Sequence, residues 1–360
     1  MKDLSTTLLY VLGIGGMFLL LIAPHEGGHF FFAKLFKVRV IEFSIGAGTK
    51  LWSMTRNGTL YAIRAIPVLG YVRMGGMEVG DFDEANGFHS KSAWQKILIL
   101  AGGPAANFVF AMLIVTGLGM TQLSAKPFSE TDPAHISAVM PNTPAARVGF
   151  QAGDNIRTIN GQTVTSPDQL RNAEASAPGA ALVVGGVHAD GRPFDFVVVP
   201  ACDKTACLVG LRVSPVITIQ TAVKAGVTFP FVAVGGIVQG LWSLVDGKVS
   251  GGLLGSQGLT GPIGIADVTT QAVSAGPADY LFLVALLSVA LGFTNLLPLL
   301  ALDGGRIVVV VIEWLRRRPF DRAMELNFQR WGLVALLALA AVISFLDIQR
   351  IATGQFPGMH

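Results

Sequence analysis

A five-residue motif near the start of the chain has the residue types of a metal-dependent hydrolase. Residues 25–29 are HEGGH and fit the pattern H-E-x-x-H. On a helix, this spacing places the imidazoles of His25 and His29 on one face, where they can share one tetrahedral zinc ion. Glu26 would lie beside that ion, where it can take a proton from zinc-bound water and pass it to a leaving amide nitrogen. The motif therefore predicts a zinc site for amide hydrolysis.

This motif lies inside an apolar stretch, Leu4 to Phe32, that is long enough to cross the ~30 Å hydrocarbon layer of a membrane. Two histidines and a glutamate in a membrane span cost free energy unless they face a polar cavity, so such a cluster indicates a functional site. The alternative is a polar cluster that only packs helices together. No small-x-small site ends the stretch, so we expect a permanent membrane helix and not a cleaved signal peptide.

The composition is that of a polytopic membrane protein. Of 360 residues, 51% are hydrophobic and 14% are charged, and the mean hydropathy is +0.57. A net charge of +3, without a basic patch interleaved with aromatic residues, argues against a nucleic-acid partner. A borderline apolar stretch runs from Gly226 to Val245. Three further stretches are long enough to span the membrane: Ile97 to Met120, Tyr280 to Leu302 and Trp331 to Phe345.

Basic residues follow the first and the third of these spans and orient the chain. By the positive-inside rule, both basic segments are cytoplasmic. Four crossings satisfy this rule and five do not, so Gly226 to Val245 is predicted to be an amphipathic or interfacial helix. The region between the second span and that helix then lies outside the cytoplasm, as do both termini. The basic residues are Lys34, Lys37, Arg39, Lys50, Arg56, Arg64, Arg73, Arg316, Arg317, Arg318 and Arg322.

A catalytic zinc site normally has three protein ligands and an open position, so the motif needs one more ligand. Asp303 ends the third span, directly before a basic cytoplasmic segment, and His29 also precedes a basic segment. The topology thus brings both residues to a similar depth on one side of the membrane. The other histidines are expected to be surface residues: His89, His135, His188 and His360.

Two regions have the short apolar runs and turn signals of β-structure. From Ile41 to Met74, such runs flank Asn57-Gly58 and predict a β-hairpin, which lies between two spans and can dip into the membrane. From Ile136 to Val213, they predict a compact soluble module, in which PAARVGFQAGDNIRTING at residues 144–161 resembles the signature of bacterial PDZ domains. Cys202 and Cys207, at the end of this module, form either a local disulfide or a simple pair of small side chains.

HEGGH on one span and NLLPLLALDGG at residues 295–305 together resemble the paired signature of the site-2 protease family of intramembrane zinc metalloproteases. FSIGAG, GYVRMGG, GGPAANFVFA and GPIGIA, at residues 43–48, 70–76, 102–111 and 261–266, resemble the bacterial branch represented by the regulator of sigma-E protease. The resemblance extends over nearly the whole chain. One PDZ-like module is apparent here, where that protein has two.

The resemblance implies a role for each site residue. His25, His29 and Asp303 would bind Zn²⁺, Glu26 would be the general base, and Asn295 would position the substrate backbone or stabilise the oxyanion. Asn295 could instead merely join helices. The resemblance also implies that the hairpin is membrane-associated, and that its edge holds an unwound substrate as an added strand. The substrate contacts predicted on that edge are Gly70, Tyr71 and Val72, and the alternative is an ordinary cytoplasmic hairpin.

The predicted function is hydrolysis of peptide bonds in transmembrane substrates, such as single-span anti-sigma factors or leftover signal peptides, in the bacterial inner membrane. A catalytically idle adaptor, or a protease for surface substrates, would not need polar groups at this depth. The PDZ-like module could capture peptides or exclude bulky domains, and no oligomeric state is predicted.

The expected fold is a polytopic α-helical membrane protein with about four transmembrane helices, a membrane-associated β-hairpin and an inserted β-rich PDZ domain. Its parts are residues 1–120 with two spans and the hairpin, 121–220 with the PDZ domain, 221–279 with the interfacial helix and a connector, and 280–360 with the last two spans.

Overall fold

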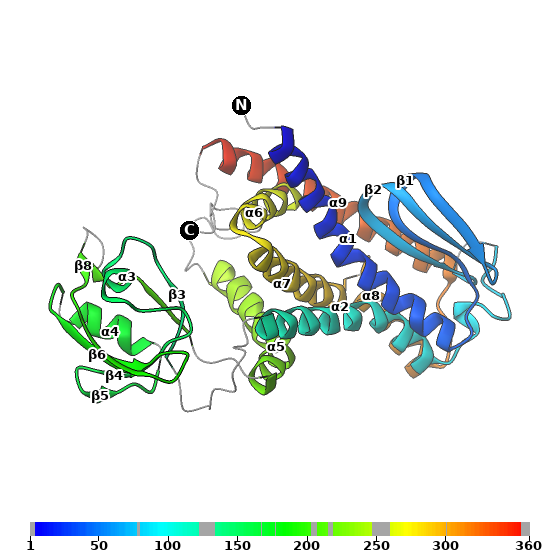
Figure 1. Ribbon diagram of the computed structural model, residues 1–360. Coiled ribbons are helices and arrows are strands. Elements are labelled where there is room, and N and C mark those ends of the chain that lie inside the picture. Colours follow the sequence, from blue (N-terminus) through cyan, green and yellow to red (C-terminus); the bar gives the residue numbers. More distant parts are fainter. Residues whose placement is uncertain are drawn as a thin grey trace. The chain divides into compact units, whose positions relative to one another are not determined.

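The computed structural model describes residues 4–77, 80–121, 134–166, 168–176, 178–202, 207–214, 219–246, 260–299 and 301–353. The chain divides into two compact units. The first comprises Met1–Leu118 and Gly226–His360, and the second comprises Gly119–Ala225 (Figure 1). The predicted module of residues 121–220 falls within the second unit. The two ends of the chain, including His360, lie outside the described residues.

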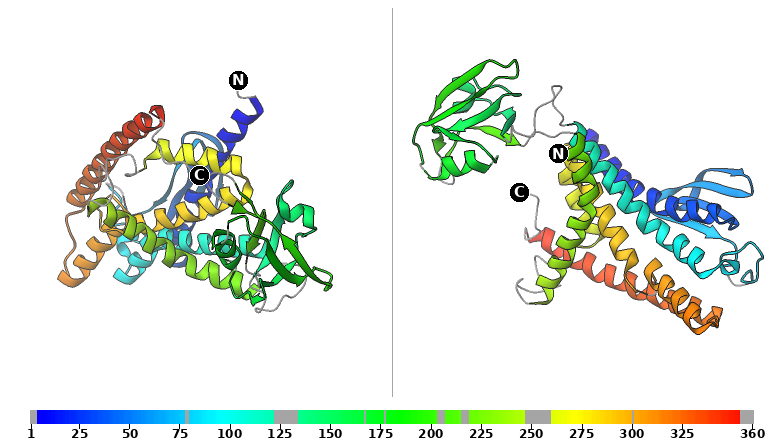
Figure 2. Two further views of the ribbon diagram at one scale, coloured as in Figure 1. Left: turned by 90° about the vertical axis from the view of Figure 1, so that its left-hand side faces the viewer. Right: turned by 90° about the horizontal axis from the view of Figure 1, so that it is seen from below.

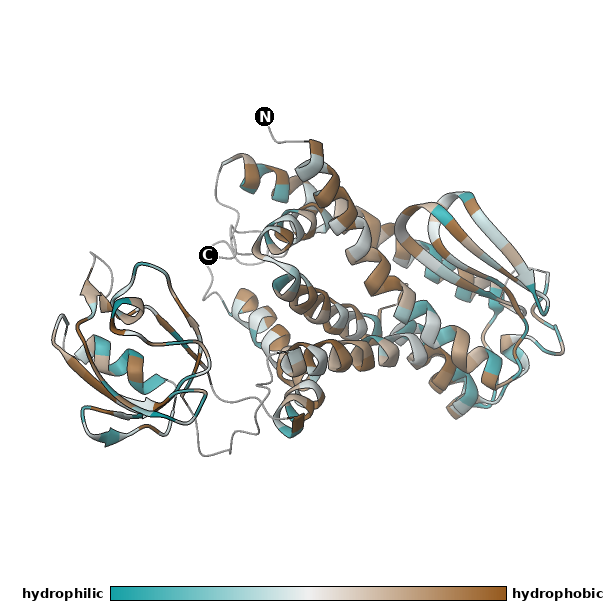
Figure 3. Ribbon diagram, in the orientation of Figure 1, coloured by the Kyte–Doolittle hydropathy of each residue, from teal (hydrophilic) through white to brown (hydrophobic). Residues whose placement is uncertain are grey.

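Helices form most of the first unit, and their exposed surfaces are largely apolar (Figure 3). Five of the described helices, α1, α2, α5, α7 and α9, are long and apolar enough to cross a membrane. The chain is therefore a membrane protein in which backbone polar groups are satisfied within helices. The helix bounds are α1 Leu4–Leu35, α2 Ala93–Thr121, α5 Ile219–Val245, α6 Pro262–Ala275, α7 Pro277–Leu296, α8 Asp303–Arg316 and α9 Arg322–Ala352, with a 3₁₀ turn at Phe88–Ser90.

Helix α5 is one candidate span more than the four that were predicted. In its middle, Ala233 is buried in a cluster with Ala111 of α2 and Val289 of α7. Farther along, Val238 and Trp242 are exposed. In the views of Figure 2, the helix crosses the ends of α2 and α7 at a steep angle. Its placement at the membrane interface stays a prediction.

The third predicted span, Tyr280 to Leu302, is wrong at its C-terminal end. Helix α7 stops at Leu296, and Leu297 adopts an extended conformation with ψ 145°. The cause is Pro298, because the ring of a proline disfavours helical geometry in the residue before it. The chain then turns and starts a new helix, α8, at Asp303. Asp303 is therefore the first residue of a short helix and not the last residue of a span.

A buried carboxylate of α9 binds the start of α6. The sequence did not predict this contact. Asp347 of α9 is 0% exposed and accepts hydrogen bonds from the backbone N–H groups of Gly261 and Gly264, at 2.8 and 2.9 Å. These two amides belong to the first turn of α6, where backbone donors have no partner within the helix. The GPIGIA segment is thus fixed to α9 by one side chain.

The predicted β-hairpin is confirmed, with strands β1, Val40–Arg56, and β2, Thr59–Met74. Asn57 and Gly58 turn the chain with φ values of 49° and 74°, as a two-residue hairpin loop requires. Both strands are bent, so the first half of β1 pairs with β2 twice: Phe43 lies opposite Tyr61 on one side and Val72 on the other. Within the described residues, the segment 70–74 therefore pairs on one side only and forms an edge of the sheet.

The second unit is β-rich, as predicted, and its identity as a PDZ domain stays a prediction. Ile136, Ile156 and Val184 lie at the centre of its apolar core. Cys202 and Cys207 form a disulfide. The main antiparallel sheet consists of β3 His135–Val139, β4 Asn155–Ile159, β5 Gln162–Thr163, β6 Leu182–Val187, β7 Pro193–Val198 and β10 Leu211–Ser214. The remaining elements are α3 Pro144–Val148, α4 Asp168–Ser176, β8 Ala201–Cys202 and β9 Cys207–Leu208.

A buried glutamate in this unit leads to a stability prediction. Glu174 is 6% exposed, and its Oε1 accepts a hydrogen bond of 2.7 Å from the Val209 N–H. Burial raises the pKa of the Glu174 carboxyl above 4.5, against the lowering effect of that hydrogen bond. The protonated Glu174 carboxyl therefore contributes fully to the free energy of unfolding below about pH 4.5. This contribution is lost as the pH rises through the raised pKa.

At pH 7, Glu174→Gln should keep the acceptor without the charge and leave the unit at least as stable as the parent. Glu174→Ala should lose about 1–3 kcal/mol, because it leaves the Val209 amide unsatisfied. Hydrogen exchange of the peptide containing Val209, followed in the full chain, measures both effects. Equal protection in the parent and the Ala variant would contradict the role of this hydrogen bond.

Candidate active site

Three atoms that could bind a metal ion, from α1 and the start of α8, lie close together. The Nε2 atoms of His25 and His29 are 3.3 Å apart. Asp303 Oδ2 lies 3.2 Å from the first and 3.3 Å from the second. The two histidines are one helical turn apart on α1 and are 8% and 7% exposed. Among the described residues, this is the cluster of His, Cys, Asp and Glu that could hold a metal ion.

The three separations fit a tetrahedral zinc site. Two zinc ligands with bonds of about 2.0–2.1 Å, at a tetrahedral angle, lie about 3.3 Å apart. The nearly equilateral triangle of Nε2, Nε2 and Oδ2 has this edge length. The fourth vertex of such a tetrahedron stays free for another ligand, and catalytic zinc sites have this open position.

The hydrogen bonds behind the two imidazoles are also those of metal ligands. His29 Nδ1 lies 2.8 Å from the Ile99 carbonyl oxygen and can only donate to it, which leaves Nε2 unprotonated and able to bind a metal. His25 Nδ1 lies 3.3 Å from Asn107 Nδ2, and Asn107 Oδ1 is buried without a partner. Since amide O and N are interchangeable in assignment, turning the Asn107 amide lets Oδ1 accept from the His25 Nδ1–H. Both histidines then present Nε2 to zinc.

Neither Ile99 nor Asn107 was predicted as a site residue. Both lie on α2, which crosses α1 so closely that a Cβ atom at Gly28 would overlap the Gly102 backbone, and one at Gly103 would overlap the His29 ring. The GGPAANF segment, residues 102–108, thus supplies the glycines for close approach and the amide behind His25. The presence of this segment in the span after the histidine motif could have indicated a role in the site. Its contact with His25 could not be predicted, because it depends on where the two helices cross.

A cavity of about 530 Å³ adjoins the three donor atoms, and all the predicted site residues line it. Glu26 lies here, and the backbone N–H of Val72 faces its carboxylate. The edge strand comes close to α1 at Gly70, where a Cβ atom would lie 3.0 Å from Glu26 Cγ. The residues brought together are His25, Glu26, His29, Gly70, Tyr71, Val72, Asn295 and Asp303.

Asn295 is in the last turn of α7 and lines the same cavity. Its Nδ2 donates to the Leu291 carbonyl oxygen at 3.0 Å, so one donor is bonded within its own helix. Arg306, one turn after Asp303, also lines the cavity and donates to Gln329 of α9 at 2.8 Å. Arg306 was not predicted, because nothing in the sequence shows that α8 turns this side chain toward the site.

The remaining histidines lie away from this cluster. His135 and His188 are in the second unit, where they bond Asn155 and Asp154 at 3.1 and 3.0 Å. His89 was expected on the surface but is half-buried, with its Nδ1 atom inaccessible to solvent. The loop that carries it packs against α2 and α8, which its polar sequence did not indicate.

The contact behind His25 leads to a prediction for Asn107. Asn107→Ala removes the acceptor of the His25 Nδ1–H, and loss of such a supporting partner typically lowers metal affinity or activity by about 10–100-fold. Zinc affinity measured by competition with a chelator, on the purified full chain, tests this. Ser288→Ala is the control, because Ser288 Oγ donates to the Asn107 carbonyl oxygen at 3.1 Å and leaves the amide side chain untouched. Equal zinc affinity in the parent and Asn107→Ala would refute the proposed contact.

Comparison with known proteins gives a consistent result. A model of peptidase family M50 matches residues 14–339. A zinc metalloprotease RasP from Bacillus licheniformis is 28% identical over 432 residues, covering 97% of this chain and 100% of the relative. A zinc metalloprotease RasP from Oceanobacillus iheyensis is 30% identical, with 93% and 97% covered. The regulator of sigma-W protease RasP from Bacillus subtilis is 28% identical, with 92% and 96% covered.

Proposed function

The chain belongs to peptidase family M50, and on this premise we propose that it cleaves the transmembrane segments of single-span membrane proteins. It is a zinc metallopeptidase of the membrane, similar to proteases named RasP. The observation that carries the proposal is the triangle of His25, His29 and Asp303 donor atoms beside Glu26, in a cavity whose wall is the exposed edge of a β-sheet.

In the proposed mechanism, His25 and His29 would hold zinc through Nε2, and Asp303 would hold it through Oδ2. When bound, zinc acts as a Lewis acid toward the scissile carbonyl and makes water nucleophilic at neutral pH. Glu26 takes the proton from the attacking water and delivers it to the leaving amide nitrogen. Asn295, on the wall of the same cavity, stabilises the oxyanion or positions the substrate backbone through its amide.

The edge of the sheet is the proposed substrate-binding surface. A transmembrane helix uses its own amides internally, so it must unwind before a protease can reach a peptide bond. Residues 70–74 pair with β1 on one side, and the Val72 N–H faces the site. An unwound substrate can therefore add to this edge as a strand, with its backbone held near Glu26.

A proline at position 72 tests this binding mode. Val72→Pro removes the backbone donor that faces the cavity, and proline is tolerated on edge strands where the N–H is directed away from the sheet. We expect kcat/KM for a transmembrane substrate to fall by about tenfold or more, because the variant loses one backbone hydrogen bond, either to the substrate strand or to the Glu26 carboxylate that this N–H faces. Val72→Ala keeps the N–H and should retain activity close to that of the parent. Equal losses in both variants would show that only the side chain matters.

The proposed substrates are anti-sigma-factor-like single-span proteins and remnant signal peptides. The sigma-W regulator of Bacillus subtilis, named above, supports a regulatory substrate of this kind. We propose the bacterial inner membrane as the location, with the active site near the cytoplasmic side and the second unit and both termini outside. That unit would exclude bulky extracytoplasmic domains from the site, in preference to capturing peptides.

The function is tested by reconstituting the purified chain with a model single-span substrate and with the soluble part of the same substrate. We expect cuts inside the apolar segment, abolished by a zinc chelator and restored by added zinc. Mass spectrometry of the products locates the cut. Cleavage confined to the soluble part, or unaffected by the chelator, would contradict the proposal.

A further inference from the structure

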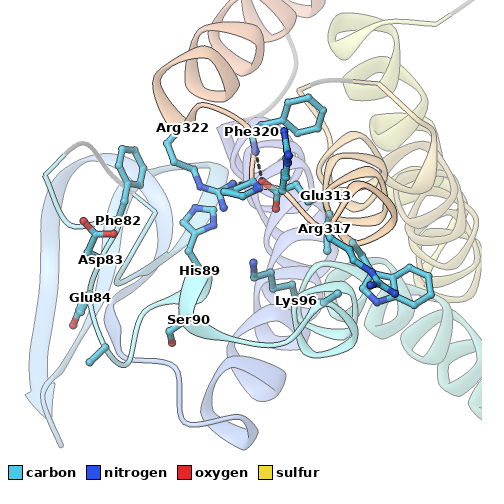
Figure 4. A pocket seen from close by; sticks show the side chains of 16 residues that line it. Phe82, Asp83, Glu84, His89, Ser90, Lys96, Glu313, Arg317, Phe320 and Arg322 are labelled. Carbon is cyan, nitrogen blue, oxygen red and sulfur yellow. Dashed lines mark hydrogen bonds and ion pairs between the residues drawn. The ribbon is translucent and has the colours of Figure 1, made fainter.

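A second cavity, of about 690 Å³, lies at the far end of α8 from Asp303. Its walls are the loop of residues 82–90, the first turn of α2, the end of α8 and the turn into α9 (Figure 4). Among the described residues, none lines both this cavity and the catalytic one. Nothing in the proposed mechanism uses it.

The cavity contains a buried ammonium group without a direct partner. Lys96 of α2 is 9% exposed, and Figure 4 shows its amine pointing between His89 and Glu313. Within the described part of the chain, its amine has no hydrogen bond and no carboxylate within ion-pair distance. A buried charge without a partner is costly, so such a group points to a site for an anionic ligand.

The nearby acidic groups are already paired. Glu313 Oε1 accepts from Arg322 at 2.6 Å and from the Phe320 N–H at 2.9 Å, and Glu84 pairs with Arg39 at 2.7 Å. Of the charged groups lining the cavity, this leaves Lys96, Arg317 and Arg318 against one carboxylate, Asp83. The cavity is therefore cationic.

His89 lies in the positive field of the same cavity. Its Nδ1 atom is buried and has no hydrogen-bond partner among the described residues. Burial, together with the positive charges of Arg322, Lys96 and Arg306, lowers the pKa of His89 to about 3. The imidazole is thus neutral at physiological pH, with a ring nitrogen directed at no protein group.

An apolar groove continues from the cavity between α8 and α9. It has a volume of about 220 Å³ and is lined by Val309, Ile312, Met324 and Phe328. Phe320 lines both the groove and the cationic cavity. Trp314, also in the cavity wall, is 66% exposed, and tryptophan is enriched at membrane–water interfaces.

We propose that the cavity and the groove together bind an anionic phospholipid, with the headgroup phosphate at Lys96 and an acyl chain between α8 and α9. The ammonium supplies a charge-assisted hydrogen bond to the phosphate. The proposed orientation places this cavity on the cytoplasmic side, where basic pockets between the helices of membrane proteins bind such headgroups. A free phosphate ion shares the headgroup chemistry but would leave the groove unused.

The test is lipid binding by the delipidated full chain, followed by native mass spectrometry and by the melting temperature. The probes are dioleoyl phosphatidylglycerol, dioleoyl phosphatidylcholine and inorganic phosphate. We expect saturable binding of phosphatidylglycerol, at least about tenfold tighter than phosphatidylcholine, with a rise in melting temperature. Inorganic phosphate should give no comparable rise.

Two variants separate the headgroup site from the groove. Lys96→Met should weaken phosphatidylglycerol binding by about tenfold or more, without lowering the melting temperature of the lipid-free chain, because it removes an unpaired buried charge. Met324→Gln, in the groove, should weaken lipid binding too. Lys37→Gln removes an exposed charge outside both cavities and should bind as the parent does.

Three results would overturn the proposal. The first is equal binding of the two lipids by the parent. The second is unchanged phosphatidylglycerol binding in Lys96→Met. The third is a melting-temperature rise from inorganic phosphate equal to that from the lipid, which would assign the cavity to a soluble anion.

Discussion

Replacement of Glu26 by Gln is expected to lower the rate of transmembrane-substrate cleavage by about 10²–10⁴-fold, the usual contribution of a general acid–base group. Gln has the shape of Glu and keeps one oxygen, but it cannot take a proton from water. The zinc content should stay that of the parent, because Glu26 contributes none of the three donor atoms at the metal position. Cleavage of a single-span substrate and the metal content of the same preparation measure the two effects together.

The two readouts for Glu26→Gln distinguish catalysis from folding. A variant that loses both zinc and activity would place Glu26 in the metal site or in the packing of α1. Gly27→Ala on the adjacent position is a control, because a Cβ atom there would meet nothing within 4 Å. It should cleave as the parent does. Cleavage by Glu26→Gln at the parental rate would rule out Glu26 as the general base.

Removal of the third ligand should have the other large effect. Asp303→Ala reduces the metal site from three protein ligands to two, the Nε2 atoms of α1. Loss of a residue that only supports a ligand already lowers metal affinity by about 10–100-fold. We therefore expect at least about a 100-fold loss of zinc affinity. Activity should be lost with it. Metal analysis after dialysis against a weak chelator measures the change.

Asp321→Ala is the matched control for Asp303→Ala. Asp321 precedes α9 as Asp303 begins α8, and its side chain accepts from the Ala323 N–H at 2.9 Å. Its loss should cost about 1 kcal/mol of helix capping and no zinc. If Asp303→Ala retained zinc as well as Asp321→Ala does, Asp303 would not be a ligand.

Local features of this chain follow from short stretches of sequence. The HEGGH spacing puts both histidines on one face because a helix turns every 3.6 residues, and it does so here on α1. Asn57-Gly58 predicts a hairpin because both residues tolerate positive φ, and both have it. Long apolar runs predict membrane helices because only such runs can cross the hydrocarbon layer without placing polar side chains in it. Each of these inferences needs only interactions between neighbours in the chain.

Features that depend on contacts between distant segments could not be predicted in this way. The close crossing of α1 and α2 puts Asn107 behind His25, 82 residues away in the sequence, and bends in β1 and β2 turn residues 70–74 into a sheet edge. The turn after Leu296 makes Asp303 the start of a separate helix. His89 is half-buried because a polar loop packs against α2 and α8. Sequence periodicity describes one element at a time, whereas these positions follow from how several elements pack against one another.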